Sequence, residues 1–216
     1  MKIKLDKRLL DIFNLVEKQY SAIWDTCCDH GKLGLAFLES NKAHTVHFVD
    51  QVPSIIAKLK RKAEMIPALD QSRATFQAKR AQDIELKEKG ELICICGVGG
   101  DVGIQIIKEI IDKNTLPCDF LICAQYHIFD LRAFLIENKF FSVREAFTFE
   151  GKWNYEVLLV SRTNGNAIDP VGKNLFSVLD NKKRTYLDSL VKHYGNKSMS
   201  DPTMKSIQKK YLELLK

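Results

Sequence analysis

The sequence has no long hydrophobic stretch. None of its apolar runs approaches the roughly 20 residues that a helix needs to cross a bilayer. The N-terminus, MKIKLDKRLL, also lacks the apolar segment and the small-residue cleavage site of a signal peptide. These two absences argue against a membrane protein and against a secreted one. We therefore expect a cytoplasmic protein with no membrane partner.

The cysteines lack the spacing of a zinc site. Zinc sites usually show paired Cys-x-x-Cys or His-x-x-x-His motifs. Here Cys27 and Cys28 are adjacent, and Cys94 and Cys96 are one residue apart. A cytosolic protein of this size rarely depends on disulfides. The sequence predicts no metal and no disulfide framework, with Cys94 and Cys96 buried as small apolar side chains.

The first predicted strand is not followed by a Gly-x-Gly-x-x-Gly motif. Dinucleotide-binding proteins use that motif to bring backbone N–H groups to a pyrophosphate at a helix N-terminus. Its absence argues against a nicotinamide dehydrogenase and against a pyrophosphate ligand. The loop that stands in its place carries Asp25 and Asp29, and an acidic loop suits a cationic ligand better than a phosphate.

The chain has a formal net charge of +6 at pH 7. Basic residues cluster at positions 2–8, 58–62 and 79–80 and through the C-terminal fifth of the sequence. A basic surface favours polyanions such as nucleic acid. Solvated helix faces would produce the same clusters, so the charge alone leaves both interpretations open.

What the sequence does contain is a regular alternation of strands and helices. Its 216 residues, 45% hydrophobic and 28% charged, are enough for one large domain or a domain with an appendage. Apolar periodicity predicts five strands, at 22–27, 45–50, 74–79, 91–96 and 118–125. It predicts helices at 5–19, 33–40, 53–66, 102–113 and 129–141. Two further strands, at 142–150 and 155–162, form a hairpin around the turn GKWN.

This order indicates an α/β fold of one kind. Alternating units imply a doubly wound parallel sheet, and a final hairpin adds an antiparallel strand to it. We predict a Rossmann-like class I methyltransferase fold, a seven-stranded, mostly parallel sheet closed by a hairpin. The polar run TNGNAIDPVG suggests a boundary, with a first domain at 1–163 and a small, helical, Lys-rich C-terminal extension at 164–216.

Polar or glycine residues follow the ends of several predicted strands. They are the segment 25–31, Asp50, Gln82-Asp83, the run 97–100 and Gln125-Tyr126-His127. Ligands of open α/β sheets bind at this edge. For an adenosine ligand, Asp50 would accept hydrogen bonds from the ribose, and Asp83 from the exocyclic amine. Gly97 and Gly99 would let the backbone approach. Ordinary turns would explain each of these residues separately.

S-adenosylmethionine fits this pattern, because it carries a sulfonium and no phosphate. Two other interpretations of the loop at 25–31 are weaker. A thiol nucleophile would need Cys27 or Cys28 to face His30, and neighbours on a tight loop rarely point at each other. A metal site would need the ligand spacing that the loop lacks.

Several motifs resemble one family, the TrmK-type bacterial tRNA adenine-N1 methyltransferases. LDKRL at 5–9 is similar to its Leu-Ser-Lys-Arg-Leu, and DTCCDHGKL at 25–33 to its Asp-Ile-Gly-Thr-Asp-His-Ala/Gly-Tyr-Leu. GVGG at 97–100 resembles its Gly-Met-Gly-Gly. LRAFLIENKF and EGKWNYEVLLV resemble its Leu-Arg-x-Trp-Leu and Gly-Lys-x-Tyr-Glu-Ile-Ile-Val segments. The resemblance covers about three quarters of the chain.

The resemblance implies methyl transfer from S-adenosylmethionine to N1 of a tRNA adenine, adenine-22 in that family. Its implied cofactor contacts, with their neighbours, are Asp25, Cys27, Asp29, His30, Asp50, Gln51, Gln82, Asp83, Gly97, Val98 and Gly99. We expect Asp29, Gln125 and Tyr126 to orient the target base, with Tyr126 stacking on it. His127 would also contact the substrate, and Lys7, Arg8 and the extension would neutralise phosphates of tRNA or another RNA.

Three positions depart from the family pattern. Cys27 replaces the loop glycine, Asp50-Gln51 replaces a strand end in glutamate, and Gln125-Tyr126-His127 replaces Gln-Pro-Asn. The last segment faces the target base in this fold, so the substrate is the least determined part. A methyltransferase of the same fold acting on another RNA, a protein or a small molecule remains an alternative. A non-catalytic RNA-binding relative is another, and Cys27 is its best support.

Overall fold

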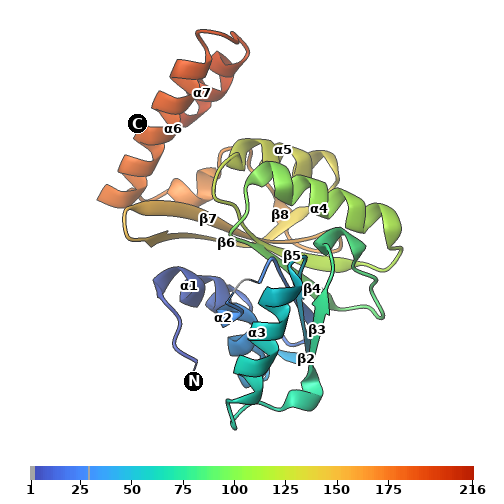
Figure 1. The fold of residues 1–216 in the computed structure, drawn as a ribbon. Coiled ribbons are helices and arrows are strands. Elements are labelled where there is room, and N and C mark those ends of the chain that lie inside the picture. Colours follow the sequence, from blue (N-terminus) through green and yellow to red (C-terminus); the bar gives the residue numbers. More distant parts are fainter. Residues whose placement is uncertain (1–2, 29) are drawn as a thin grey trace.

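The computed structural model describes residues 3–28 and 30–216 and contains one eight-stranded sheet (Figure 1). Its order is β3-β2-β1-β4-β5-β7-β6-β8. The strands are β1 Tyr20–Thr26, β2 Ala43–Asp50, β3 Ala74–Ala78, β4 Glu91–Cys96, β5 Cys118–Cys123, β6 Phe141–Glu150, β7 Trp153–Ser161 and β8 Asn166–Ala167. The first five are parallel, and β7 runs antiparallel to both β5 and β6. This confirms the predicted Rossmann-like sheet closed by a hairpin.

The predicted count of seven strands is one too low. The additional strand, β8, is only two residues long and pairs antiparallel with Phe141 and Ser142 at the start of β6. It lies inside the polar run that marked the proposed boundary. Two exposed residues without apolar alternation give no strand signal, so β8 forms only because β6 offers it an unpaired edge. The division at 163/164 stays a prediction.

Helices cover both faces of the sheet (Figure 1). They are α1 Lys7–Leu15, α2 Lys32–Glu39, α3 Pro53–Glu64, α4 Gly100–Lys113, α5 Ile128–Glu137, α6 Asn181–Lys197 and α7 Met204–Glu213. Short 3-10 turns lie at Gln71–Arg73, Ala81–Asp83 and Lys173–Phe176. Helices α1, α2 and α3 pack on one face, and α4 and α5 on the other. No helix in the described chain is long and apolar enough to span a bilayer.

The central strand β4 shows how the sequence builds the two cores. Leu92 and Cys94 point into the core beneath α1 to α3, whereas Ile93 and Ile95 point into the core beneath α4 and α5. A strand buried on both faces favours apolar residues on both sides, as Leu92 to Cys96 have, and the buried Glu91 at its start accepts a hydrogen bond from the Trp24 ring N–H. Cys94 is fully buried, as predicted. Cys96 is only half-buried, because β4 ends there at the open edge of the sheet.

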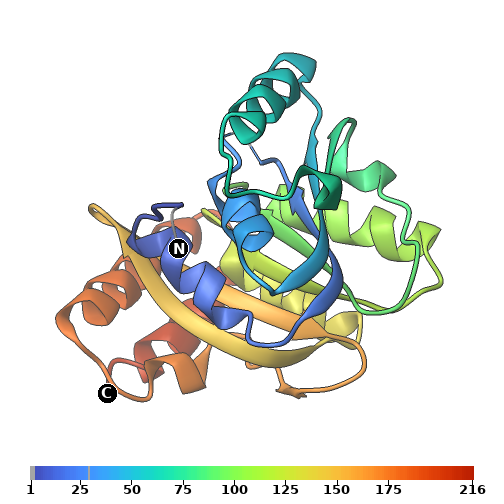
Figure 2. The ribbon, with the colours of Figure 1, turned by 90° about the horizontal axis from the view of Figure 1, so that it is seen from below.

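Helix α1 begins and ends at identifiable groups. The Asp6 side chain accepts a hydrogen bond from the Leu9 N–H at 3.1 Å and caps the N-terminus. The helix stops at Leu15, four residues before the predicted end. Lys42, from the turn before β2, donates its ammonium to the carbonyls of Phe13 and Val16 there. Figure 2 shows α1 lying across the β6–β7 hairpin, where the Thr148 hydroxyl donates to Asp11 at 2.6 Å.

The C-terminal extension is a helical hairpin that projects from the body (Figure 1). Helices α6 and α7 share a third apolar cluster with Phe129 of α5 and Phe147 of β6. Within it Tyr194 and Tyr211 stack with their ring centroids 5.6 Å apart. Asp201 accepts a hydrogen bond from the Thr203 N–H at 3.0 Å and stabilises the turn before α7. The helical extension was therefore predicted correctly.

Candidate functional site

A cavity of about 310 Å³ opens where β1 and β4 end, at the carboxyl edge of the sheet. The first turns of α1 and α2 and the end of β5 complete it. Its lining residues are Asp6, Arg8, Leu9, Asp25, Cys27, Cys28, His30, Gly31, Lys32, Leu33, Cys96, Gly97 and Gln125. The structure therefore brings together six of the predicted site residues, namely Arg8, Asp25, Cys27, His30, Gly97 and Gln125. Asp29 lies outside the described residues.

Asp25 is the buried carboxylate of this cavity. It lies one residue before the end of β1 with only 4% of its surface exposed, and its Oδ2 accepts a hydrogen bond from the Gly34 N–H of α2 at 2.9 Å. Burial raises the pKa of Asp25 to about 7, and the nearby negative charge of Asp50 adds to the rise. A cationic partner would stabilise the ionised form of this buried carboxyl group, because it offsets the cost of burying the negative charge.

Arg8 lies in the wall of the cavity and not on an open surface. Its side chain is 17% exposed, its Nε donates to Glu150 at 3.0 Å, and its guanidinium lies 5.2 Å from the Tyr155 ring centroid. Arg8 belongs to α1, whereas its partners Glu150 and Tyr155 lie on β6 and β7, more than 140 residues later in the sequence. The neighbouring Lys7 is 54% exposed and pairs with Asp11. The two residues predicted to contact phosphates thus have different surroundings, and only Arg8 faces the cavity.

The loops of the cavity keep glycine-like backbone where the ligand would approach. Gly97 has φ +94°, and a Cβ placed on it would meet no atom within 4 Å, so the space beside it is open. Cys27 has φ +54°, a left-handed conformation that glycine adopts more easily. Burial raises the pKa of the Cys27 and Cys28 thiols, which opposes formation of a nucleophilic thiolate.

The other predicted cofactor residues do not line the cavity, and Asp83 lies against Lys113 in the last turn of α4. Asp50 ends β2 and accepts a hydrogen bond from the Val52 N–H at 2.9 Å. The carboxylate of Asp83 pairs with Arg80 at 2.9 Å and with Lys113 at 3.1 Å. These hydrogen bonds lower the pKa of Asp83 to about 2. The remaining members of this group are Gln51, Gln82, Val98 and Gly99.

Gly99 has a structural reason to be glycine. A Cβ there would lie 2.3 Å from the Tyr126 ring, so any larger residue would displace that ring. The Tyr126 carbonyl in turn accepts the Gly100 N–H at 2.8 Å, which joins the loop after β5 to the start of α4. Gly99 therefore leaves the space that the Tyr126 ring occupies. Tyr126 itself remains 52% exposed.

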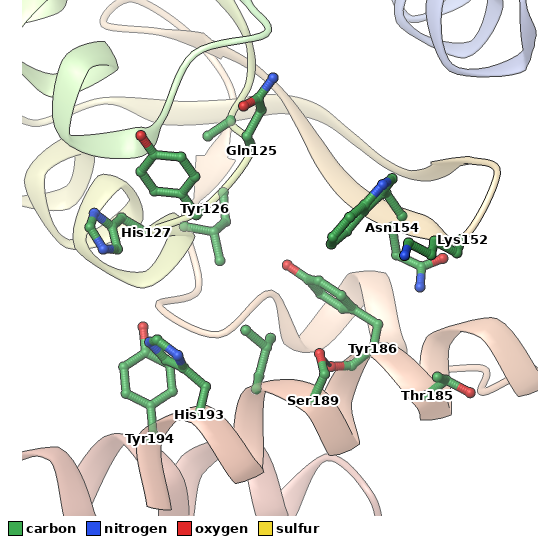
Figure 3. Close-up of a pocket in the computed structure, with 14 residues that line it drawn as sticks. Gln125, Tyr126, His127, Lys152, Asn154, Thr185, Tyr186, Ser189, His193 and Tyr194 are labelled. Carbon is green, nitrogen blue, oxygen red and sulfur yellow. Dashed lines mark hydrogen bonds between the residues drawn. The ribbon is translucent and has the colours of Figure 1, made fainter. Parts of the chain in front are cut away.

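A second, larger cavity of about 620 Å³ adjoins the first (Figure 3). Gln125 lines both cavities, so the two share one wall. Figure 3 shows the loop after β5 on one side and α6 on the other, with the start of β7 between them. The lining residues are Ala124, Gln125, Tyr126, His127, Ile128, Lys152, Trp153, Asn154, Thr185, Tyr186, Ser189, Leu190, His193 and Tyr194.

The sequence analysis missed three members of this second cavity, Trp153, Tyr186 and His193. Trp153 was assigned only to a hairpin turn, and the residues of α6 only to a basic helix. A signal was present on α6, because its cavity-lining residues recur every three or four positions, at 185, 186, 189, 190, 193 and 194. Among the described residues there is no group of three or more His, Cys, Asp or Glu side chains placed to hold a metal ion.

Comparisons with known proteins place this geometry in context. A family model described as a methyltransferase domain matches residues 5–158. The Bacillus subtilis M1A22 tRNA methyltransferase TrmK superposes with a TM-score of 0.83 and 18% identity, covering 100% of both chains. TrmK of M. capricolum, solved with S-adenosyl-homocysteine, gives 0.81 and 15%, covering 98% of this chain and 99% of that one. No curated protein matches the sequence significantly.

A third solved structure has similar values. A Streptococcus pneumoniae protein solved with S-adenosyl-L-methionine gives a TM-score of 0.81 and 17% identity, covering 99% of this chain and 100% of that one. At these identities the superpositions establish the fold over the whole length, including the C-terminal helices. The family match covers strands β1 to β6, both cavity-lining loops after β1 and β4, and part of β7.

Proposed function

The chain belongs to the methyltransferase-domain family, and on that premise we propose that it transfers a methyl group from S-adenosylmethionine to N1 of an adenine in tRNA. One observation carries the proposal. The strand-end cavity that contains Asp25 and the aromatic cavity share Gln125 as a common wall. A donor in the first cavity and a base in the second would meet across that side chain.

The residues of the first cavity fit S-adenosylmethionine by their chemistry. Its cationic groups suit the buried carboxyl group of Asp25, and its carboxylate suits the guanidinium of Arg8. The open space at Gly97 admits a ligand against the backbone. Asp50 lies close enough to influence Asp25, and its second oxygen is a candidate acceptor for the ribose. When bound, the cofactor supplies an electrophilic methyl group on a sulfonium.

The protein's task toward the base is mainly positional. Adenine N1 carries a lone pair, so the transfer requires alignment more than a strong general base. The base must be unpaired or extruded from the RNA to enter the cavity. Gln125 supplies amide donors and an acceptor at the shared wall, and the exposed ring of Tyr126 supplies a stacking surface. His127 and Asp29 stay candidates for the same task.

Similar structures support RNA as the substrate. The B. subtilis protein is a tRNA methyltransferase, and it superposes on this chain over the full length, extension included. A cytoplasmic location and a tRNA partner follow from this proposal. Cys27 takes the left-handed conformation open to glycine, so the loop can keep the shape of a cofactor loop despite the substitution. That conformation favours the enzyme over a non-catalytic relative.

Two measurements test the proposal separately. Calorimetric titration with S-adenosylmethionine and S-adenosylhomocysteine should show saturable binding, and no binding at millimolar cofactor would refute the enzyme. Nucleoside mass spectrometry of tRNA from cells with and without the gene should show loss of 1-methyladenosine. Cofactor binding with unchanged 1-methyladenosine would retain the methyltransferase and contradict its assigned substrate.

A further inference from the structure

We infer that the C-terminal extension forms part of the substrate site, with Tyr186 and His193 of α6 and Trp153 of β7 enclosing the nucleobase that the RNA extrudes. The inference rests on the proposed function for its choice of RNA and deepens it. It changes the role of the extension from a basic grip on phosphates to one wall of the base pocket.

Aromatic side chains make up much of the lining of the cavity. Six rings face it, from Tyr126, His127, Trp153, Tyr186, His193 and Tyr194. Trp153 is 62% exposed although it is a large aromatic side chain, and it is not part of the three apolar cores of the described chain. Proteins that bind single-stranded nucleic acid present exposed aromatic rings on which bases stack.

The rings come from two sides of the cavity. Figure 3 shows Tyr126 and His127 across the opening from Tyr186, His193 and Tyr194. A flat ligand entering between these sides would have aromatic surface available to both of its faces. The pocket volume of about 620 Å³ is within the usual range for sites that enclose a small organic group. The position of Gln125 places one end of this pocket against the donor cavity.

Charge identifies the molecule to which that flat group belongs. Residues 164–216 contain ten Lys and Arg against five Asp and Glu, so they carry +5 of the chain's formal net charge of +6. Lys152 adds a cation at the rim, 5.1 Å from the Trp153 ring centroid. A neutral aromatic pocket surrounded by positive charge suits a base attached to a phosphate backbone better than a free neutral metabolite or an acidic protein.

The α6 wall is fixed to the body and not merely adjacent to it. The Tyr186 hydroxyl donates to the buried Glu156 at 3.1 Å, and its ring stacks on Phe176 with centroids 6.0 Å apart. Leu187 and Tyr194 of the same helix are buried against the body. His193 projects from this anchored face, and its pKa is lowered by partial burial and by Lys197, so its ring stays neutral near pH 7. A neutral ring can stack on a base and adds no positive charge toward the phosphates.

The test uses two exposed side chains whose loss should leave the fold intact. We expect Trp153→Ala and His193→Ala each to weaken binding of an unmodified tRNA transcript by roughly 5- to 100-fold, the effect of losing one stacked base. The affinity for S-adenosylmethionine should stay unchanged. His44→Ala, an exposed histidine on β2 away from the pocket, is the matched control and should bind the transcript as the wild type does.

Salt dependence separates a base contact from a phosphate contact. A lost phosphate contact would make the plot of log affinity against log salt shallower by about 0.7 to 0.9. Loss of stacking should lower affinity by the same factor at every salt concentration. Parallel plots for wild type, Trp153→Ala and His193→Ala would support the inference. Wild-type affinity in both variants, or a shallower slope in both, would overturn it.

The failure of this inference differs from the failure of the proposed function. If the wild type bound the transcript but transferred no methyl group, the proposed reaction would be wrong while the variants could still establish the pocket. If methyl transfer occurred with unchanged KM for the transcript in both variants, the reaction would stand and the pocket assignment would fall. If the wild type bound no RNA at all, both would be refuted.

Discussion

Arg132 and Glu156 form a fully buried ion pair that joins α5 to β7, with Nη2 2.7 Å and Nε 2.9 Å from the same carboxylate oxygen. Arg132 also donates to Glu145 at 2.6 Å and to the Asp169 carbonyl at 3.0 Å. The other oxygen of Glu156 accepts the Tyr186 hydroxyl of α6. The pair therefore ties the sheet, α5 and the extension together at one point.

Removing Arg132 should destabilise the protein strongly. Arg132→Met leaves Glu156 buried without its counter-charge, and such losses typically cost about 3–5 kcal/mol. Arg144→Ala, which breaks the exposed pair with Glu17, is the control and should cost less than about 1 kcal/mol. Urea denaturation of both variants measures the difference. Equal losses would show that the buried pair contributes no more than a surface pair.

The same substitution at two tyrosines should have opposite effects. Tyr186→Phe removes a hydroxyl that donates to Glu156 and should lower the free energy of unfolding by about 1–2 kcal/mol. The Tyr211 hydroxyl is buried with no hydrogen-bond partner within the described chain. Tyr211→Phe should therefore leave stability unchanged or raise it by about 1 kcal/mol. Thermal unfolding followed by circular dichroism compares the two, and a loss at Tyr211 would reveal a missed partner.

The protonation of Asp25 should appear in the pH dependence of stability. Its folded pKa of about 7 exceeds the unfolded value of about 4, so its contribution is full below about pH 4 and is lost as the pH rises through 7. Asp25→Asn has no such proton. The variant should gain stability relative to the wild type by about 1.4 kcal/mol per pH unit between pH 5 and 7. Urea titrations at three pH values measure it, and a constant difference would contradict the shift.

Gly34 should tolerate no side chain. A Cβ there would lie 2.4 Å from the Phe48 ring and 2.6 Å from the Asp25 carboxylate, so Gly34→Ala should cost about 1–3 kcal/mol and weaken cofactor binding. Gly103→Ala is the matched control in α4, where the nearest atom would be 4.0 Å away. It should raise stability by about 0.5–1 kcal/mol through helix propensity alone. If both variants were destabilised equally, the space around the added Cβ would not be what distinguishes the two positions.

Arg8 and Lys7 should differ in their effect on cofactor affinity. Arg8→Ala removes the guanidinium from the cavity and should weaken S-adenosylmethionine binding by roughly 10- to 100-fold, the usual effect of losing a charged hydrogen bond. Lys7→Ala, the adjacent exposed cation, should leave that affinity unchanged. Titration calorimetry on both variants distinguishes the cavity role of Arg8 from a general effect of basic charge. Equal effects in both variants would indicate only a general effect of basic charge.

The sequence predicted the sheet well because its central strands are encoded locally. In β4, the apolar residues from Leu92 to Cys96 indicate burial on both faces, and the glycines after Cys96 mark the strand end. The end of α1 was predicted too late. Lys42, which donates to the Val16 carbonyl at the end of this helix, is 26 residues further along the chain. Periodicity cannot report such a contact. The two-residue β8 depends in the same way on the edge of β6.

The candidate site was predicted in part for the same reason. Asp25 and Gly97 end neighbouring strands, so topology alone brings them together. Arg8 reaches the cavity only through the packing of α1 on the hairpin, and the sequence predicted a phosphate contact for it but no place in the cavity wall. The partners of Asp83, Arg80 and Lys113, lie on different elements. Trp153 and α6 meet across 30 or more residues, which no local pattern encodes.

The docking of α1 has a consequence for how the protein emerges from the ribosome. The helix is translated before the hairpin, and the contacts that hold it to β6 join residues 142 and 137 positions apart in the chain. Contacts of such separation form late, because a long loop must close before they can stabilise anything. Arg8 thus reaches its place only after the hairpin has left the exit tunnel. A nascent chain that lacks the hairpin therefore lacks the support that places Arg8 in the wall of the strand-end cavity.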